Sequence, residues 1–156
     1  MSPIKNGRKV VIVIAEGSSD EEALYPFLKE LGKPHNVKFA ITHGDVLSDS
    51  KNTGKSQKTL IGGIVSTIIK ENKFLKEDIL LVAQLTDTDG VFIDEEKVVI
   101  DSAVEGMEYR DFEIAVHNKG KHEDILTRNK LKSSKVKDLV NTQFALPSIP
   151  YKMYYF

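Results

Sequence analysis

Three acidic residues follow apolar segments of the chain, where folding could bring them together. Glu16 comes after the apolar run 10–15, and Asp87 and Asp89 come after a second apolar run that begins at Ile79. An extended backbone points residues two apart to the same side, so Asp87 and Asp89 could share one ligand. Crowded carboxylates are costly without a counterion, and a hard divalent cation is the usual partner. The spacing predicts a site for Mg²⁺ (or Mn²⁺) if the two segments are neighbours.

Both apolar segments have the pattern of strands that are covered on both faces. Residues 9–15 and 78–85 form nearly continuous apolar runs, which is typical of parallel sheets. A helical pattern at 20–32, an alternating pattern at 37–42 and a second helical pattern at 58–73 lie between them. This alternation predicts right-handed βαβ units and an α/β fold, with a mostly parallel central sheet flanked by helices.

The first predicted helix begins near Asp20, with Ser18 or Ser19 as its N-cap, and ends at Gly32. Pro26 is expected in or near its first turn, where proline is tolerated. The apolar spacing predicts one packing face for this helix, made of Leu24, Phe27, Leu28 and Leu31.

The pattern changes after residue 90. Segment 91–103 predicts two short β pieces around an acidic turn, and segment 112–117 predicts another strand. The basic segment 121–140 is expected to be helical in two pieces. The aromatic end, residues 147–156, is expected to form a short strand, and its apolar last residue leads us to expect that the natural protein continues.

Composition allows one domain and gives little evidence about partners. The chain has 156 residues, 22 basic and 23 acidic side chains, and a net charge of -1. The absence of cysteine excludes disulfides and cysteine zinc sites. No window reaches the roughly 18 apolar residues of a membrane helix. We therefore expect a cytoplasmic protein without a membrane partner, with a flexible lead at 1–8 and a single domain over 9–156.

The order of the acidic motifs resembles the Toprim domain, which topoisomerases, bacterial primases, ribosomal maturation nucleases and OLD-type nucleases share. That family places Glu-Gly after its first strand and Asp-x-Asp after a later strand. Here these motifs are Glu16-Gly17 and Asp87-Thr88-Asp89, within a resemblance that covers roughly residues 9–95. The long loop before the second helix is more similar to that of the OLD-type nucleases than to that of the primases.

The resemblance implies a Toprim-like (Rossmannoid) fold and phosphodiester chemistry on nucleic acid. Glu16 would be a general acid/base or a metal ligand, and Asp87 and Asp89 would be magnesium ligands. Asp20, three residues after Gly17 as in several members, is a candidate for a further ligand. Asp45 also follows a predicted strand and is a second such candidate, with a turn-forming role as the alternative.

Three lysines near the second helix are candidates for contact with a nucleic-acid backbone: Lys51, Lys55 and Lys58. The segment 49–56 also resembles the tail of a P-loop, but Asp49 stands where the first glycine would be. A solvated surface loop is the alternative for this segment. The basic run 119–137 also has two interpretations. It is either a phosphate-contacting face or a solvated helix surface.

These motifs support two functional hypotheses. The first is an Mg²⁺-dependent nuclease domain of the Toprim type, acting on DNA or RNA. The alternative is a non-catalytic Toprim-like module that binds nucleic acid or protein within a larger defence or mobile-element protein. A receiver-like domain with Asp87 as phosphoryl acceptor is disfavoured, because receivers carry their acidic pair after the first strand and not after a later one.

Overall fold

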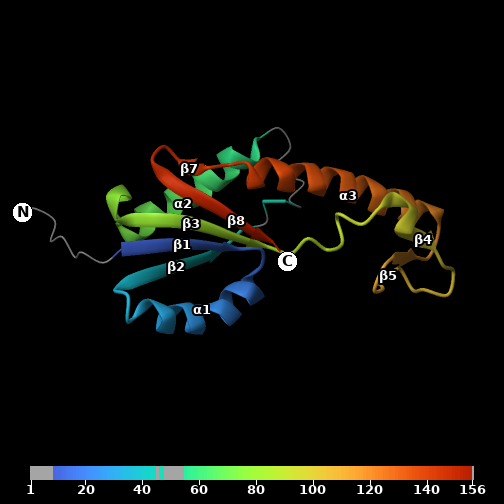
Figure 1. The fold of residues 1–156 in the computed structure, drawn as a ribbon, viewed down its shortest axis with the longest axis horizontal. Coiled ribbons are helices and arrows are strands. Elements are labelled where there is room, and N and C mark those ends of the chain that lie inside the picture. The colour runs from blue at the N-terminus through green and yellow to red at the C-terminus, as the bar shows by residue number, and fades with distance from the viewer. Residues whose placement is uncertain (1–8, 45, 48–54, 156) are drawn as a thin grey trace, which may run out of the picture. The chain divides into compact units, whose positions relative to one another are not determined.

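The computed structural model describes residues 9–44, 46–47 and 55–155 (Figure 1). The chain divides into two compact units. Unit 1 consists of Met1–Asp87 with Leu139–Phe156, and unit 2 consists of Thr88–Asp138. That the whole segment 9–156 acts as one domain stays a prediction.

Unit 1 is built on a five-stranded sheet with the order β2-β1-β3-β8-β7. The first four strands in this order pair in parallel, and β7 pairs with β8 in the antiparallel direction. The α/β class and the mostly parallel sheet are therefore confirmed. The strands are β1 (Lys9–Ala15), β2 (Val37–His43), β3 (Ile79–Thr86), β7 (Phe144–Leu146) and β8 (Ile149–Tyr155).

Two helices accompany this sheet. Helix α1 (Ser18–Gly32) contacts β1 and β2, and helix α2 (Gln57–Asn72) contacts β7. A short 3-10 helix, η2 (Lys76–Asp78), leads into β3. The core of unit 1 consists of fully buried aliphatic side chains from the central strands, from α2 and from β8: Ile12, Ile14, Val82, Ile61, Val65 and Ile149.

A buried polar pair joins the middle strands β3 and β8. Gln84 is 2% exposed, and its Oε1 accepts a hydrogen bond of 2.7 Å from the Tyr151 hydroxyl. Burial raises the pKa of Tyr151 above its ordinary value, so the phenol keeps the proton that it donates. The Nε2 atom of Gln84 donates to Thr86 Oγ1 at 3.4 Å. The Gln84 side chain thus has a partner at each end.

Helix α1 differs from the expectation in how it starts and in which face it buries. Its N-cap is Gly17, so Ser18 and Ser19 lie within the first turn. Pro26 lies inside the helix, well past that first turn. Phe27 is 74% exposed and therefore does not belong to the packing face.

The face of α1 that packs runs through Glu21, Leu24 and Leu28 to the buried Gly32, and the exposed Leu31 is not part of it. Gly32 is needed because the backbone of β2 comes very close there. A Cβ atom at this position would lie 2.3 Å from the Val37 carbonyl oxygen.

Unit 2 combines a small sheet with helix α3 (Lys119–Val140), whose last residues belong to unit 1. The sheet has the order β4-β6-β5, with β4 and β6 parallel and β5 antiparallel to β6. Its core contains Val98, Ile114, Val116 and Ile125. The other elements are β4 (Val98–Ile100), β5 (Met107–Tyr109), β6 (Ile114–Val116) and the 3-10 helix η3 (Glu95–Lys97).

The sequence predicted unit 2 only in part. The short β pieces at 98–100 and 114–116 are present, but residues 91–93 form turns and not a strand. Strand β5 was not expected. The prediction of two helical pieces at 121–140 was wrong, because α3 is one continuous helix of 22 residues.

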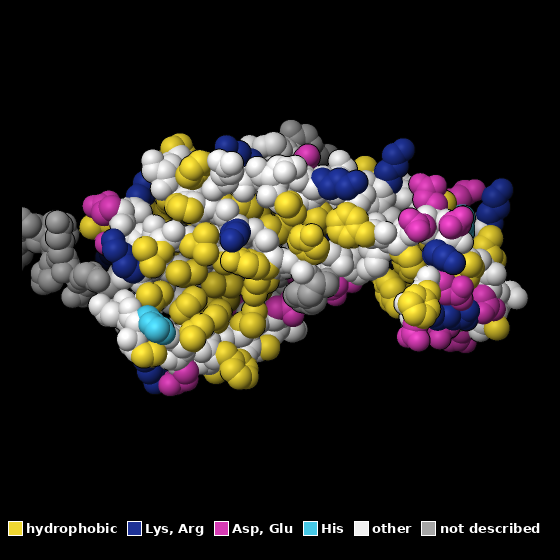
Figure 2. Space-filling model, viewed as in Figure 1, with side chains coloured by type: hydrophobic (Ala, Val, Ile, Leu, Met, Phe, Trp, Pro, Cys, Tyr) yellow, Lys and Arg dark blue, Asp and Glu magenta, His cyan; other side chains and the backbone are white. Residues whose placement is uncertain are grey.

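The surface shows apolar side chains on the strands of unit 1 (Figure 2). Leu80 on β3 is 46% exposed and Tyr154 on β8 is 45% exposed. No helix among the described residues is both long and apolar enough to cross a membrane.

The close approach at Gly32 generates the first testable prediction. Gly32→Ala should lower the free energy of unfolding by roughly 1–3 kcal/mol, because its new Cβ meets backbone that cannot move cheaply. Gly63→Ala in α2 is the matched control, since no atom of the described residues lies within 4 Å of the Cβ it adds. That control should raise stability by roughly 0.5–1 kcal/mol. Urea unfolding measures both changes, and equal effects at the two positions would contradict the packing described for α1.

Candidate functional site

Glu16 and Asp87 meet at the carboxyl ends of two neighbouring parallel strands. Strand β1 pairs with β3 in a register that reaches Ile14 opposite Gln84. Glu16 follows β1 and Asp87 follows β3, and Glu16 Oε2 accepts a hydrogen bond of 2.9 Å from the Asp87 backbone amide. The condition for the predicted site, that these two strands are neighbours, is met. The hydrogen bond holds the Glu16 carboxylate at the end of β3.

Asp20 lines the same pocket as Glu16 and Asp87. Its Oδ2 accepts a hydrogen bond of 3.2 Å from the Gly17 amide, at the start of α1. This position is favourable for an acid, because the first turn of a helix exposes amide hydrogens and a partial positive charge. Glu16, Asp20 and Asp87 line one pocket of about 220 Å³, together with Ala23, Leu24 and Leu85.

A histidine that the sequence did not single out lies one strand away from Glu16. His43 ends β2, which pairs with β1, and the register places His43 opposite Ala15. Its Nδ1 lies 2.6 Å from Glu21 Oε2. Its position at the end of a predicted strand, directly before Gly44, was the signal that could have identified it.

Asp89 has a different environment, which lies within unit 2. Its carboxylate Oδ2 accepts a hydrogen bond of 2.7 Å from Lys132 Nζ. Its backbone has a positive φ of 48°, and its carbonyl oxygen accepts a hydrogen bond from Arg128 Nη2. The Lys132 side chain is only 5% exposed, whereas that of Asp89 is 41% exposed. The carboxylate therefore compensates a buried ammonium group.

Sequence reasoning missed the role of Lys132, because it lies in a basic run that was expected to face solvent or phosphate. A signal was present in the spacing. The buried residues of α3 recur at helical intervals of four and three, and Lys132 occupies one of these positions: Ile125, Asn129, Lys132, Val136 and Leu139.

The predicted phosphate contacts are described only in part. Lys51 and Asp45 lie outside the described residues, as does most of the P-loop-like segment. Lys55 and Lys58 are exposed near the start of α2. Ser56 is the N-cap of that helix and accepts a hydrogen bond from the Thr59 amide.

The acids around Glu16 were expected to hold a metal ion. Among residues 9–44, 46–47 and 55–155, no group of three or more His, Cys, Asp or Glu side chains is placed to hold a metal ion. Mg²⁺ often binds through one or two carboxylates and keeps several waters. Glu16 and Asp87 follow adjacent strands and line one pocket, so they are the candidates for that smaller donor set.

The Asp89–Lys132 pair generates a second prediction. In a double-mutant cycle of Asp89→Asn and Lys132→Met, the coupling should be about 1–2 kcal/mol, because the ammonium is buried while the carboxylate is partly solvated. The exposed pair Glu30–Lys33, with N···O at 2.6 Å, is the control and should couple by less than about 1 kcal/mol. Urea unfolding of both sets of variants gives the two values. A weaker coupling for Asp89–Lys132 than for the control would show that burial does not strengthen this pair.

Comparison of the chain with protein-family models, with curated proteins and with solved structures found no match. A function for this chain therefore has to be argued from the geometry of its two units.

Proposed function

We propose that unit 1 carries a Toprim-type, Mg²⁺-dependent site (or Mn²⁺-dependent site) that cleaves phosphodiesters in nucleic acid, DNA or RNA. The observation that supports this most directly is the 2.9 Å hydrogen bond from the Asp87 amide to Glu16 Oε2. It brings together the two motifs on which the resemblance rests. Ligands of open parallel sheets bind outside the carboxyl ends of the strands, and both acids lie at such ends.

The three acids that line the pocket of unit 1 would each have a role. Asp87 and Glu16 would hold the metal ion, with Glu16 also placed to take or give a proton. Asp20, fixed by the Gly17 amide and lining the same pocket, would orient metal-bound or attacking water. A bound divalent ion supplies charge stabilisation for the phosphoryl oxygens and a more acidic water. Lys55 and Lys58 are exposed cations that would contact backbone phosphates.

Asp89 matches the second aspartate of the Toprim motif, which would make it a magnesium ligand. Its environment in the structure gives this role less support than Glu16 and Asp87 have. In the structure its carboxylate accepts a hydrogen bond from the buried Lys132 ammonium. A carboxylate that compensates a buried cation is a weaker metal ligand, because binding metal would leave that cation with less compensation. This observation favours a second candidate function, a non-catalytic module that binds nucleic acid or protein within a larger defence or mobile-element protein.

Activity assays distinguish the two candidates. The chain should cleave labelled single-stranded DNA, double-stranded DNA or RNA in the presence of Mg²⁺ or Mn²⁺. Glu16→Gln and Asp87→Asn should each reduce the rate by roughly a hundredfold or more, because each removes a charged group from the reacting centre. Asp78→Asn is the matched control, since Asp78 precedes the same strand at its opposite end, and the rate should stay within about twofold of wild type.

Calorimetry with Mn²⁺ gives the second readout. Asp87→Asn should weaken Mn²⁺ binding, and Asp78→Asn should leave it unchanged. Nucleic-acid binding without cleavage, unaffected by Glu16→Gln, would establish the non-catalytic module and overturn the nuclease.

A further inference from the structure

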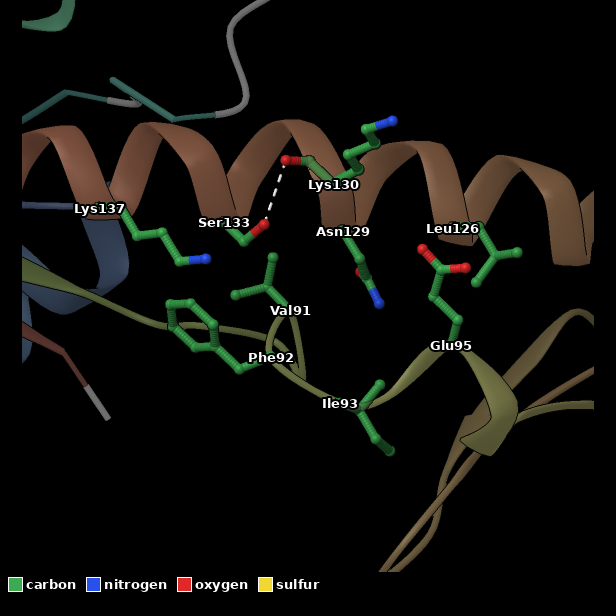
Figure 3. Close-up of a pocket in the computed structure, with 9 residues that line it drawn as sticks. All are labelled: Val91, Phe92, Ile93, Glu95, Leu126, Asn129, Lys130, Ser133 and Lys137. Carbon is green, nitrogen blue, oxygen red and sulfur yellow. Dashed lines mark hydrogen bonds between the residues drawn. The ribbon is translucent and has the colours of Figure 1, made fainter.

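A pocket of about 270 Å³ in unit 2 lies between α3 and residues 91–95 (Figure 3). Apolar side chains line it together with the Glu95 carboxylate and the Lys130 and Lys137 ammonium groups. Charges of both signs beside apolar walls indicate no single class of ligand. The outer edge of β2 in unit 1 is different, because the backbone of an edge strand has a defined complement, which is another strand.

Strand β2 (Val37–His43) forms a long and regular border of the sheet in unit 1 (Figure 1). Within the described residues it pairs with β1 alone, and this pairing runs from Val37 to His43 without a register shift. The opposite border, β7, has three residues and an irregular pairing with β8. Short or irregular strands keep a sheet edge from pairing with another chain. Strand β2 has seven residues, no proline and no bulge, so this protection is missing there.

The backbone of β2 presents hydrogen-bonding groups on its outer side. The Gly44 amide donates to the Ala15 carbonyl oxygen at 3.0 Å, so the backbone groups of Gly44 and of every second residue before it point to β1. The backbone groups of Phe39 and Ile41, which lie between those residues, point to the outer side. Within the part of the chain that the structure describes, these outer groups make no hydrogen bond. Another strand would provide their partners.

Helix α1 leaves this edge accessible. None of the seven residues of β2 is buried, whereas five of the seven residues of β1 are. A surface pocket of about 170 Å³ opens between α1 and β2, and its lining residues are Tyr25, Lys29, Val37, Lys38 and Phe39. The helix therefore does not seal the strand from solvent.

Contacts with α1 mark the two ends of the accessible stretch. At the first end, Gly32 of α1 comes so close to the Val37 carbonyl oxygen that a Cβ on it would lie 2.3 Å from that atom. At the other end, His43 Nδ1 lies 2.6 Å from Glu21 Oε2. The middle of the edge, residues 39–41, is therefore the part that a further strand can reach.

A second copy of β2 fits this middle part in the antiparallel direction. With Ala40 opposite Ala40 of the second copy, Phe39 lies opposite Ile41, and such a pair exchanges two backbone hydrogen bonds. An aromatic side chain opposite a β-branched one is also a favourable cross-strand pair. Lys38 lies opposite Thr42, so no two like charges face each other across the strands. The edge is thus complementary to itself, as a twofold dimer requires.

We propose that the protein forms a twofold dimer through antiparallel pairing of β2 from two copies, with Ala40 at the axis. The sheets of the two copies then join into one. Their β2 strands run in opposite directions, so the two Glu16 sites lie at opposite edges of the joined sheet. The dimer needs neither a metal ion nor Glu16, and the inference is independent of the proposed function.

Disulfide cross-linking tests the dimer and its register. The chain has no cysteine, so Ala40→Cys adds a single thiol. Opposite residues that share no hydrogen bond have Cα atoms about 4.5 Å apart, which is within the range of a disulfide. Mild oxidation of Ala40→Cys should therefore give a covalent dimer on a non-reducing gel.

Thr42→Cys is the matched control on the same face of the same strand. Its two thiols are about four strand positions apart in the proposed register, roughly 13 Å, which is too far for a disulfide. The covalent dimer should be at least about tenfold less abundant than with Ala40→Cys.

Sedimentation equilibrium gives a second readout without a cross-link. The wild-type chain should form a dimer between about 1 and 100 µM. Thr42→Lys places a like charge opposite Lys38 and should raise the dissociation constant by about fivefold, whereas Thr42→Glu should lower it by about fivefold. A folding defect at residue 42 would not shift the two variants in opposite directions.

Three outcomes would overturn the proposal: a wild-type monomer over the whole concentration range, equal cross-linking of Ala40→Cys and Thr42→Cys, or shifts of Thr42→Lys and Thr42→Glu in the same direction. Glu16→Gln should form the dimer as wild type does. Failure of the nuclease proposal and failure of the dimer are therefore separate results.

Discussion

The parallel pairing of β1 with β3 is the constraint on which the candidate site in unit 1 depends. Both strands are nearly continuous apolar runs, and parallel pairing makes their carboxyl ends lie on one edge of the sheet. The register contains one irregularity, between Val10 and Val11. Val10 pairs with Ile79, but Val11 pairs with Leu81, so every later residue of β1 lies opposite a residue one position further along β3. A one-residue change of register exchanges the two faces of a strand. The irregularity thus helps to determine which residue at the end of β3 lies beside Glu16.

The central strands of unit 1 could be predicted because their burial requires apolar side chains on both faces. A strand covered on both faces has a continuous apolar sequence, and β1 and β3 have such sequences. Strand β8 was expected as a strand, but its place between β3 and β7 could not be predicted. That place depends on long-range pairing and on the hydrogen bond from Tyr151 to Gln84, and sequence periodicity carries no information on either.

The packing faces of the helices were harder to predict, because side-chain polarity and burial disagree at several positions. Phe27 and Leu31 have apolar side chains, yet α1 leaves them exposed and packs through Leu24, Leu28 and Gly32 instead. On α3 the opposite occurs, since Asn129 and Lys132 are polar and yet buried. A count of charges describes α3 as a solvated surface. The spacing of four and three residues identifies the buried face of α3 correctly. This works only if polar residues are accepted as members of that face.

The buried polar side chains discussed here, all within the described residues, are of two kinds. Gln84 and Lys132 have partners for their buried atoms, so each fixes one arrangement of the elements that it joins. Asn129 is paired only through its oxygen, and its nitrogen lacks a partner within the described part of the chain. An unsatisfied buried donor costs roughly 1–3 kcal/mol. The oxygen of Asn129 therefore serves the fold of unit 2, whereas its nitrogen is buried without a partner among the described residues.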